Sequence, residues 1–128
     1  MKVLALDYGA ARTGVAVSDP TGTLARPLRI VERAASEEGM RELAELVRAE
    51  EAERVVVGLP LTLRGERGGQ AKETERFVEA LEAILDVPVE RFDERFTTTL
   101  AGPGGDEDAR AAAHLLTGYL EWSRNRQP

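Results

Sequence analysis

An acidic residue at the end of an apolar run is the first feature of this sequence that could do chemistry. The stretch LALDYGAARTGVAVSD runs from Leu4 to Asp19, and Asp7 closes its first apolar run. Residues 2–8 are mostly apolar on both faces, as in a central strand, and a carboxylate is costly to bury there. A turn-forming aspartate is the alternative interpretation. Gly9 would let the backbone turn tightly, and Gly14 would let a phosphate chain pass close.

Further acidic positions can converge with Asp7. They are Asp93 and Glu94, after the strand expected over residues 87–92, and Asp106 or Asp108, at the start of the last helix. In open α/β sheets, the active crevice lies at the carboxyl ends of the parallel strands. Clustered carboxylates repel one another unless cations bind them. An all-oxygen set without cysteine or histidine is typical of Mg²⁺ or Mn²⁺, and two such ions can clamp the oxygens of a phosphodiester.

Each of these acids also has a purely structural interpretation. Acids that open a helix stabilise its dipole, so Asp108 could be a cap. Asp93 and Glu94 could form a solvated strand end. His114 lies about 240° around the last helix from Asp108, which favours packing or surface exposure over a ligand role.

The periodicity of the chain predicts the elements that must position these residues. Strands are expected over residues 2–8, 14–19, 26–33, 54–60 and 87–92, the third an edge strand with Pro27 near its start. Ser36 is expected to cap a first helix. A second follows the loop 61–70 with Phe77, Val78, Leu81, Ile84 and Leu85 on one face. The last starts near Asp108 with Ala112, Leu115, Leu116 and Tyr119 inward, and the tail 123–128 is expected to fray.

This order of elements predicts an α/β fold. Three consecutive strands form a meander, and the later strands alternate with helices, so they should pair in parallel through right-handed crossovers. The result is a mixed five-stranded sheet flanked by helices. The length of 128 residues fits one domain over 1–128.

Composition excludes several classes of protein. No apolar run is long enough to span a membrane, the N-terminus lacks the pattern of a signal peptide, and there is no cysteine, so a cytoplasmic protein is expected. The net charge of −6 is unusual for a nucleic-acid binder. However, 15 of the 17 basic residues are arginine, which holds phosphates bidentately. A compositional bias of the source genome would also explain that excess.

Four stretches together resemble one family. LALDYGAARTGVAVSD, VVVGLPL, FDERFTT and DARAAAHLLTGYLE occur in the right order over nearly the whole chain. They resemble the YqgF family, described as Holliday-junction-resolvase-like proteins or pre-16S rRNA nucleases. The resemblance implies a ribonuclease-H-like fold and a metal-dependent cytoplasmic nuclease, a hydrolase acting on ester bonds. It also implies a role in maturing the 5′ end of small-subunit ribosomal RNA during ribosome biogenesis.

The same resemblance implies roles for individual residues. Asp7, Glu94 and Asp108 match the three catalytic acids and therefore the Mg²⁺ or Mn²⁺ ligands. Packing also favours Asp108 over Asp106, because Asp108 shares a helical face with Ala112. The residues predicted to contact substrate phosphates are Arg12, Arg95, Arg64, Arg67 and Lys72.

One segment departs from the family pattern. Only nine residues, 99–107, separate Thr98 from Asp108, and none is basic, whereas the family carries a longer basic segment there. A positive contact surface is therefore expected to be missing, which weakens nucleic-acid binding because phosphate neutralisation supplies much of the affinity.

Several interpretations of function and partner stay open. The partner is expected to be structured RNA such as pre-16S rRNA, or branched DNA, with a ribosomal subunit precursor as a further partner and no membrane. The chain is expected to be a monomer or weak homodimer. The alternatives are a non-enzymatic ribosome-assembly or nucleic-acid-binding partner, or a Holliday-junction-type DNA resolvase. The first motif also resembles the phosphate loop of actin-like ATPases, but those enzymes need two such domains.

Overall fold

A mixed five-stranded sheet forms the centre of the molecule. The computed structural model describes residues 1–60, 68–93 and 107–126, with side chains over 109–124 in the last range. The strands are β1 (Val3–Asp7), β2 (Arg12–Ser18), β3 (Ala25–Glu32), β4 (Arg54–Leu59) and β5 (Val89–Asp93). The helices are α1 (Glu37–Ala49), α2 (Gly69–Ile84) and α3 (Glu107–Arg126).

The strand order is β3-β2-β1-β4-β5, with β1 in the middle and β3 at an edge. β1, β2 and β3 pair antiparallel through short connections, as the meander predicted. β1, β4 and β5 pair in parallel, which requires the crossovers that α1 and α2 supply. The residues of β1 before Asp7 are at most 2% exposed, as expected of a central strand. The predicted fold class is confirmed.

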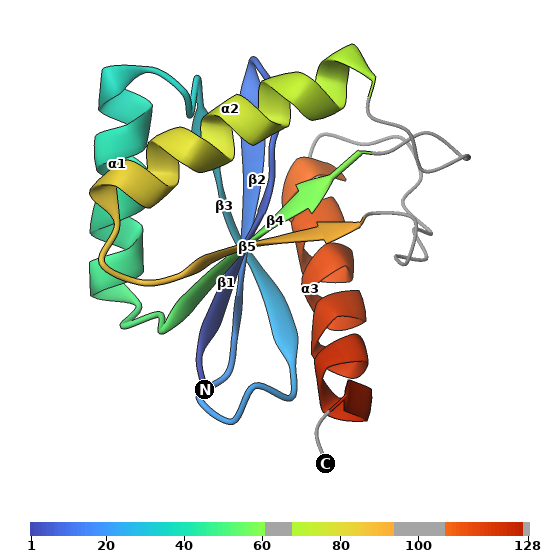
Figure 1. The fold of residues 1–128 in the computed structure, drawn as a ribbon. Coiled ribbons are helices and arrows are strands. Elements are labelled where there is room, and N and C mark those ends of the chain that lie inside the picture. The colour runs from blue at the N-terminus through green and yellow to red at the C-terminus, as the bar shows by residue number, and fades with distance from the viewer. Residues whose placement is uncertain (61–67, 94–106, 127–128) are drawn as a thin grey trace.

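The helices form one layer on each face of the sheet. α1 and α2 cover one face and α3 covers the other (Figure 1). Because strand side chains alternate, Leu4 and Leu6 pack in the core under α1 and α2, whereas Val3 and Ala5 pack in the core under α3. The same alternation assigns Asp7 to the α3 face.

Local sequence explains where α1 begins. The Ser36 hydroxyl accepts a hydrogen bond from the Gly39 N–H at 3.0 Å, which confirms the predicted N-cap. Gly39 is buried, and a Cβ there would run into the Arg33 carbonyl and Ala34. Glycine therefore lets the first turn of α1 pack directly on the chain that leaves β3.

α3 presents the apolar face that the sequence predicted. Ala112, Leu115, Leu116 and Tyr119 are all at most 2% exposed against the sheet. The expectation of a frayed tail was wrong up to Arg126, because α3 continues to that residue. Over the described residues, no helix combines the length and the apolar character needed to cross a membrane.

Two other expectations were wrong in detail. Ile84 is 49% exposed, because it is the last residue of α2 and lies beyond the stripe of Phe77, Val78 and Leu81 that meets the sheet. β2 begins at Arg12 rather than Gly14, because Arg12 and Thr13 already pair with Glu32 and Val31 of β3. The turn after β1 is correspondingly shorter than predicted.

Candidate active site

Asp7 ends the central strand between two glycines. Its register partner on β2 is Gly14, and on β4 Gly58 follows Val57, the partner of Leu6. Both neighbours lack a side chain, so neither adjoining strand places one against the half-buried Asp7. The adjoining strands therefore put no side chain of their own beside this carboxylate, as the approach of a metal ion or a phosphate would require.

The turn after Asp7 depends on a third glycine. The Gly9 N–H donates to the Thr13 hydroxyl oxygen at 3.3 Å, and that hydroxyl lies at the same distance from the Gly9 carbonyl, to which it donates. A Cβ at Gly9 would lie 2.5 Å from the Arg12 carbonyl oxygen. The predicted need for glycine in this turn is confirmed, and the turn fixes where β2 begins relative to Asp7.

Tyr8 ties the same strand end to the opposite layer. Its ring stacks on Phe77 of α2 with centroids 4.2 Å apart, and its hydroxyl donates to Glu73 at 3.4 Å. Burial raises the pKa of Tyr8, and the Glu73 carboxylate raises it further. Tyr8 therefore stays protonated at neutral pH and holds the first half of α2 beside the end of β1.

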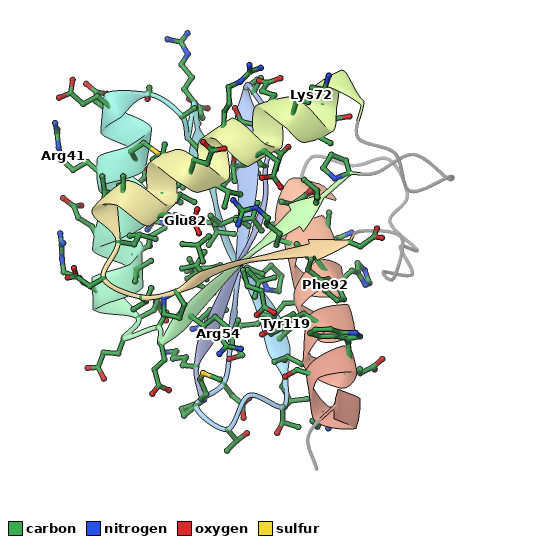
Figure 2. All side chains as sticks on the ribbon, viewed as in Figure 1. Arg41, Arg54, Lys72, Glu82, Phe92 and Tyr119 are labelled. Atoms are coloured by element: carbon green, nitrogen blue, oxygen red, sulfur yellow. The ribbon has the colours of Figure 1, made fainter. Side chains whose placement is uncertain are left out.

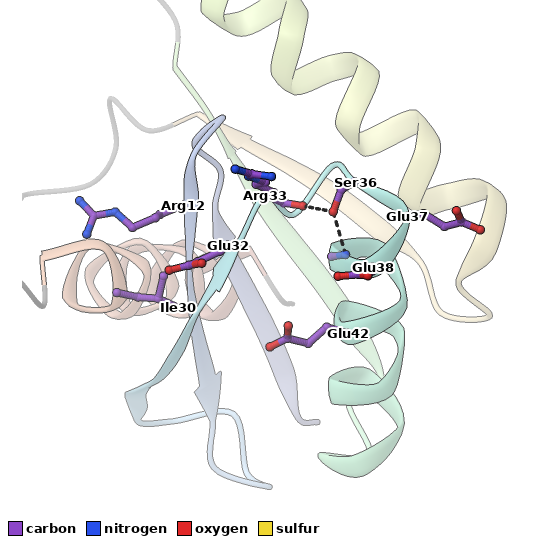
Figure 3. Close-up of a pocket in the computed structure, with 9 residues that line it drawn as sticks. Arg12, Ile30, Glu32, Arg33, Ser36, Glu37, Glu38 and Glu42 are labelled. Atoms are coloured by element: carbon purple, nitrogen blue, oxygen red, sulfur yellow. Dashed lines mark hydrogen bonds between the residues drawn. The ribbon is translucent and has the colours of Figure 1, made fainter.

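Arg12 lies on the face that carries Asp7. It starts β2, is exposed, and stands two residues before Gly14, so strand alternation turns both toward α3. In Figure 3, Arg12, Ile30 and Glu32 project to the side of the sheet where α3 lies. The structure thus places Arg12, one predicted phosphate ligand, on the same face of the sheet as Asp7 and at the same end of the strands.

The start of α3 packs on the sheet near this end of the strands. Asp108 belongs to its first turn, and Ala109 and Ala112 are buried against the sheet. A groove joins Ala109 to Ile30, the register partner of Gly14. Small residues after Asp108 therefore allow the close approach that the sequence predicted.

The other predicted site residues are placed differently. Lys72 is exposed in the first turn of α2, on the layer opposite α3 (Figure 2). Arg91 pairs with Glu75 of α2 at 2.9 Å, so alternation places Asp93 on that side, away from the face of Asp7. Outside the described residues are Glu94, Arg95, Arg64, Arg67 and Asp106.

The chemistry of the donors fits a hard cation. Within the described ranges no group of three Asp, Glu or His side chains is arranged so that it could hold a metal ion, and the side chains of two predicted ligands, Glu94 and Asp108, lie outside those ranges. All three are carboxylates, and the chain has no cysteine. Oxygen donors of this kind suit Mg²⁺ or Mn²⁺. His114 is half-buried on α3, as expected of a packing residue.

A large hollow in the described part of the chain does not suit a phosphate. It has a volume of about 970 Å³ and lies between β3 and the start of α1 (Figure 3). Arg12 and Arg33 line it, but so do four carboxylates, Glu32, Glu37, Glu38 and Glu42. These acids would repel an anion, so the strand end at Asp7 remains the candidate site.

Sequence reasoning missed two residues near this site. Gly58 was given no role within the strand expected over residues 54–60, yet it lies inside β4 beside Asp7. Arg110 is exposed on the first turn of α3, two residues after Asp108. Its position in DARAAA was a usable signal, because a cation so close to a proposed metal ligand can reach the same substrate.

The sheet order, the crossovers and the acidic strand tip define a ribonuclease-H-like fold. Solved structures agree. The Thermus thermophilus RuvC in complex with a Holliday junction substrate superposes with a TM-score of 0.65 at 18% identity, over 98% of this chain and 96% of that chain. The fowlpox virus Holliday junction resolvase gives a TM-score of 0.57 at 12% identity, over 95% and 99%.

Sequence comparison is more specific. The model of the RuvX (YqgF) family, described as Holliday junction resolvase, matches residues 1–122, and the chain belongs to this family. A relative from Chloroflexus aggregans is 48% identical over 135 residues, covering 96% of this chain and 95% of its own. One from Anaeromyxobacter sp. (strain K) is 39% identical, covering 94% and 97%. Both carry the name "Putative pre-16S rRNA nuclease". The resemblance to the YqgF family is confirmed.

Proposed function

We propose that this protein is a metal-dependent nuclease that hydrolyses phosphodiester bonds. Its role would be the maturation of the 5′ end of pre-16S rRNA during ribosome biogenesis, in the cytoplasm. The observation that carries the proposal is Asp7, held at the tip of the central strand between two glycines, in a chain of the RuvX family. The names of the relatives support ribosomal RNA as substrate. Branched DNA is the alternative, supported by the family description.

Asp7, Glu94 and Asp108 would hold Mg²⁺ or Mn²⁺. The bound ions would stabilise charge on the phosphate and lower the pKa of the attacking water. Asp93 is the weaker candidate for the second ligand, since alternation along β5 turns it toward α2. Asp7 itself offers a carboxylate on the rigid centre of the sheet, where its position is fixed by buried neighbours.

Arg12 would orient the substrate. Its guanidinium starts from the same face of the sheet and the same end of the strands as Asp7, and arginine can hold two phosphate oxygens at once. Arg95, Arg64, Arg67 and Lys72 are further candidates, of which Lys72 would reach the substrate only around the tip of the β1–β2 hairpin.

The test is cleavage by an Asp7→Asn variant. Precursor rRNA 5′ fragments, duplex RNA and branched DNA are incubated with Mg²⁺ or Mn²⁺. Asp7→Asn should abolish cleavage while its melting temperature without metal stays equal or rises, because a like-charge repulsion is removed. Asp86→Asn, an exposed carboxylate before β5, is the control and should cleave like the parent protein.

Three results would contradict the proposal. Normal cleavage by Asp7→Asn would remove the carboxylate from the mechanism, and unfolding of the variant would make Asp7 structural. A parent protein that binds small-subunit precursors but cleaves no substrate would instead be a non-enzymatic assembly partner.

A further inference from the structure

A groove beside the candidate site has no role in the mechanism above. It has a volume of about 420 Å³ and lies between the edge strand β3 and the first turn of α3. Its lining residues are Pro27, Leu28, Arg29, Ile30, Ala109 and Arg110. Four of these six are apolar, and each of the two lining segments contributes one arginine.

The groove and Asp7 share one row of the sheet. Asp7 pairs with Gly14, and Gly14 pairs with Ile30, so the three residues lie side by side across β1, β2 and β3. Adjacent strands are about 4.8 Å apart, which puts the backbone of Ile30 roughly 10 Å from that of Asp7. Within this row, Gly14 is the one residue between Ile30 of the groove and Asp7, where the phosphate that reacts is proposed to bind.

Arg110 is the cation that this groove offers to an anion. It is exposed and makes no hydrogen bond or ion pair within the part of the chain that the structure describes. Arg29 is already engaged, since its Nη1 lies 3.1 Å from a Glu42 carboxylate oxygen. The groove therefore combines an apolar floor with one cation at its rim.

We propose that the groove is a subsite for one unpaired nucleotide next to the bond that is cut, with the base against Ile30 and Pro27 and the phosphate at Arg110. The subsite rests on the proposed nuclease function and narrows its substrate class to nucleic acid with an unpaired nucleotide at the cut, as at a single-stranded end or a branch point. An unpaired base binds between apolar side chains, and a guanidinium matches its phosphate.

A second copy of the chain is the rival occupant of this edge. Strand addition needs free N–H groups along β3, and Pro27 has none. In the antiparallel register centred between Pro27 and Leu28, Arg26 of one copy would also oppose Arg29 of the other. These features favour a nucleotide over another strand.

The experiment measures binding in EDTA, where metal-dependent cleavage cannot occur. A labelled RNA duplex with a short single-stranded overhang and the blunt duplex of the same sequence are titrated by fluorescence anisotropy at several salt concentrations. The variants are Arg110→Ala and Ile30→Thr. Arg124→Ala is the matched control, because Arg124 is equally exposed and without a partner in the described residues, about 21 Å further along α3.

Loss of Arg110 should lower the salt dependence of overhang binding by about one phosphate contact, a slope change of roughly 0.7–0.9. Ile30→Thr should keep that slope but weaken overhang binding about fivefold or more, and leave blunt-duplex binding unchanged. Ile30→Val should give a smaller loss in the same direction, which provides a second readout should the threonine variant melt early. Arg124→Ala should match the parent protein.

Three results would contradict the proposed subsite, and each leads to a different conclusion. If both groove variants bind like Arg124→Ala while the parent protein still cleaves, the nuclease stands without this subsite. If Ile30→Thr changes the oligomeric state in sedimentation and not the binding of RNA, the groove is a self-association surface. If the parent protein neither binds nor cleaves any nucleic acid, the nuclease and its subsite fail together.

Discussion

At the residue scale, three glycines surround the candidate carboxylate for two reasons. Gly9 is required by the turn, where a Cβ would meet the Arg12 carbonyl oxygen. Gly14 and Gly58 flank Asp7 in the sheet and keep side chains away from it. Glycine weakens a strand, so the two strand glycines, Gly14 and Gly58, keep side chains away from Asp7 at the expense of stability.

Gly9→Ala should destabilise the protein by about 1–3 kcal/mol, because its methyl group overlaps backbone and the turn must shift. Gly69→Ala is the control. A Cβ at Gly69 meets nothing within 4 Å at the start of α2, so alanine should leave the free energy of unfolding unchanged or raise it by up to about 1 kcal/mol. Chemical denaturation of both variants measures the difference, and equal effects would show that the turn adapts to a side chain.

The role of a single residue could be predicted from the sequence only where the residues next to it in the chain indicated that role. Asp7 stands out in an apolar run, and Arg12 follows it closely in the chain. Arg110 stands two residues after Asp108, which was a usable signal for a substrate contact, but its place beside Ile30 depends on how α3 crosses the sheet, which no local pattern encodes. The residue pattern alone left both Asp93 and Glu94 open, and only the family resemblance favoured Glu94. The ion pair of Arg91 with Glu75 then showed that alternation along β5 turns Asp93 toward α2.

At the element scale, α3 is anchored in its second half by Tyr119, about three turns after Asp108. The Tyr119 hydroxyl donates to Glu90 at 2.6 Å and accepts from Arg54 at 2.8 Å, and the Phe92 ring meets the Tyr119 ring edge-on at 5.5 Å (Figure 2). Burial and the bond to Glu90 raise the pKa of Tyr119, against an opposing effect of Arg54, so the phenol stays neutral. This network joins α3 to β4 and β5 and sets its register on the sheet.

Tyr119→Phe should lower the free energy of unfolding by about 1–3 kcal/mol, because Arg54 and Glu90 lose a shared partner. Tyr8→Phe is the matched control and should change it by less than about 0.5 kcal/mol, since its hydroxyl makes one long, exposed bond to Glu73. Cleavage by folded Tyr119→Phe should be unchanged. A loss of cleavage without a loss of stability would instead give the network a part in placing Asp108.

The loop between β2 and β3 depends on one ionised side chain. Asp19 accepts hydrogen bonds from the Thr21 hydroxyl and from the Thr23 and Leu24 N–H groups, and these lower its pKa to about 2, the Thr21 bond most. Because the folded pKa lies below the unfolded value of about 3.9, the stabilisation is complete above about pH 5 and is lost as pH falls toward 2. Thermal melts of the parent protein and Asp19→Asn should therefore differ at pH 6 and converge near pH 2. A difference that persists at pH 2 would mean that the ionised form does not matter.

Elements were more predictable than their ends. Apolar periodicity identified all eight of the described helices and strands, and chain order fixed which strands pair in parallel. The errors lie at ends, where pairing with another strand extended β2 back to Arg12, and where α2 ran past the sheet and left Ile84 exposed. Such ends depend on tertiary neighbours, which local propensity does not contain.

At the scale of the whole molecule, a protein with a net charge of −6 is expected to repel the polyanionic substrate proposed for it. Exposed carboxylates of α1, such as Glu37 and Glu45, lie on the layer opposite α3. The face of the sheet that α3 covers carries Arg12 and Arg110, at the same end of the strands as Asp7. Because charges further apart than about 8 Å are largely screened at physiological salt, local cations rather than the net charge should govern binding.

Binding of the best substrate should therefore show a shallow dependence on salt. At most six cations are proposed to contact phosphates: Arg12, Lys72, Arg110, Arg64, Arg67 and Arg95. Each releases about 0.9 counterions from a duplex, so the slope of log affinity against log salt should not exceed about 5 in magnitude. Glu45→Lys, which changes the net charge from −6 to −4 far from the site, should leave the slope and the affinity unchanged. A slope near 8, or an affinity that rises with Glu45→Lys, would mean that the binding surface extends beyond the α3 face.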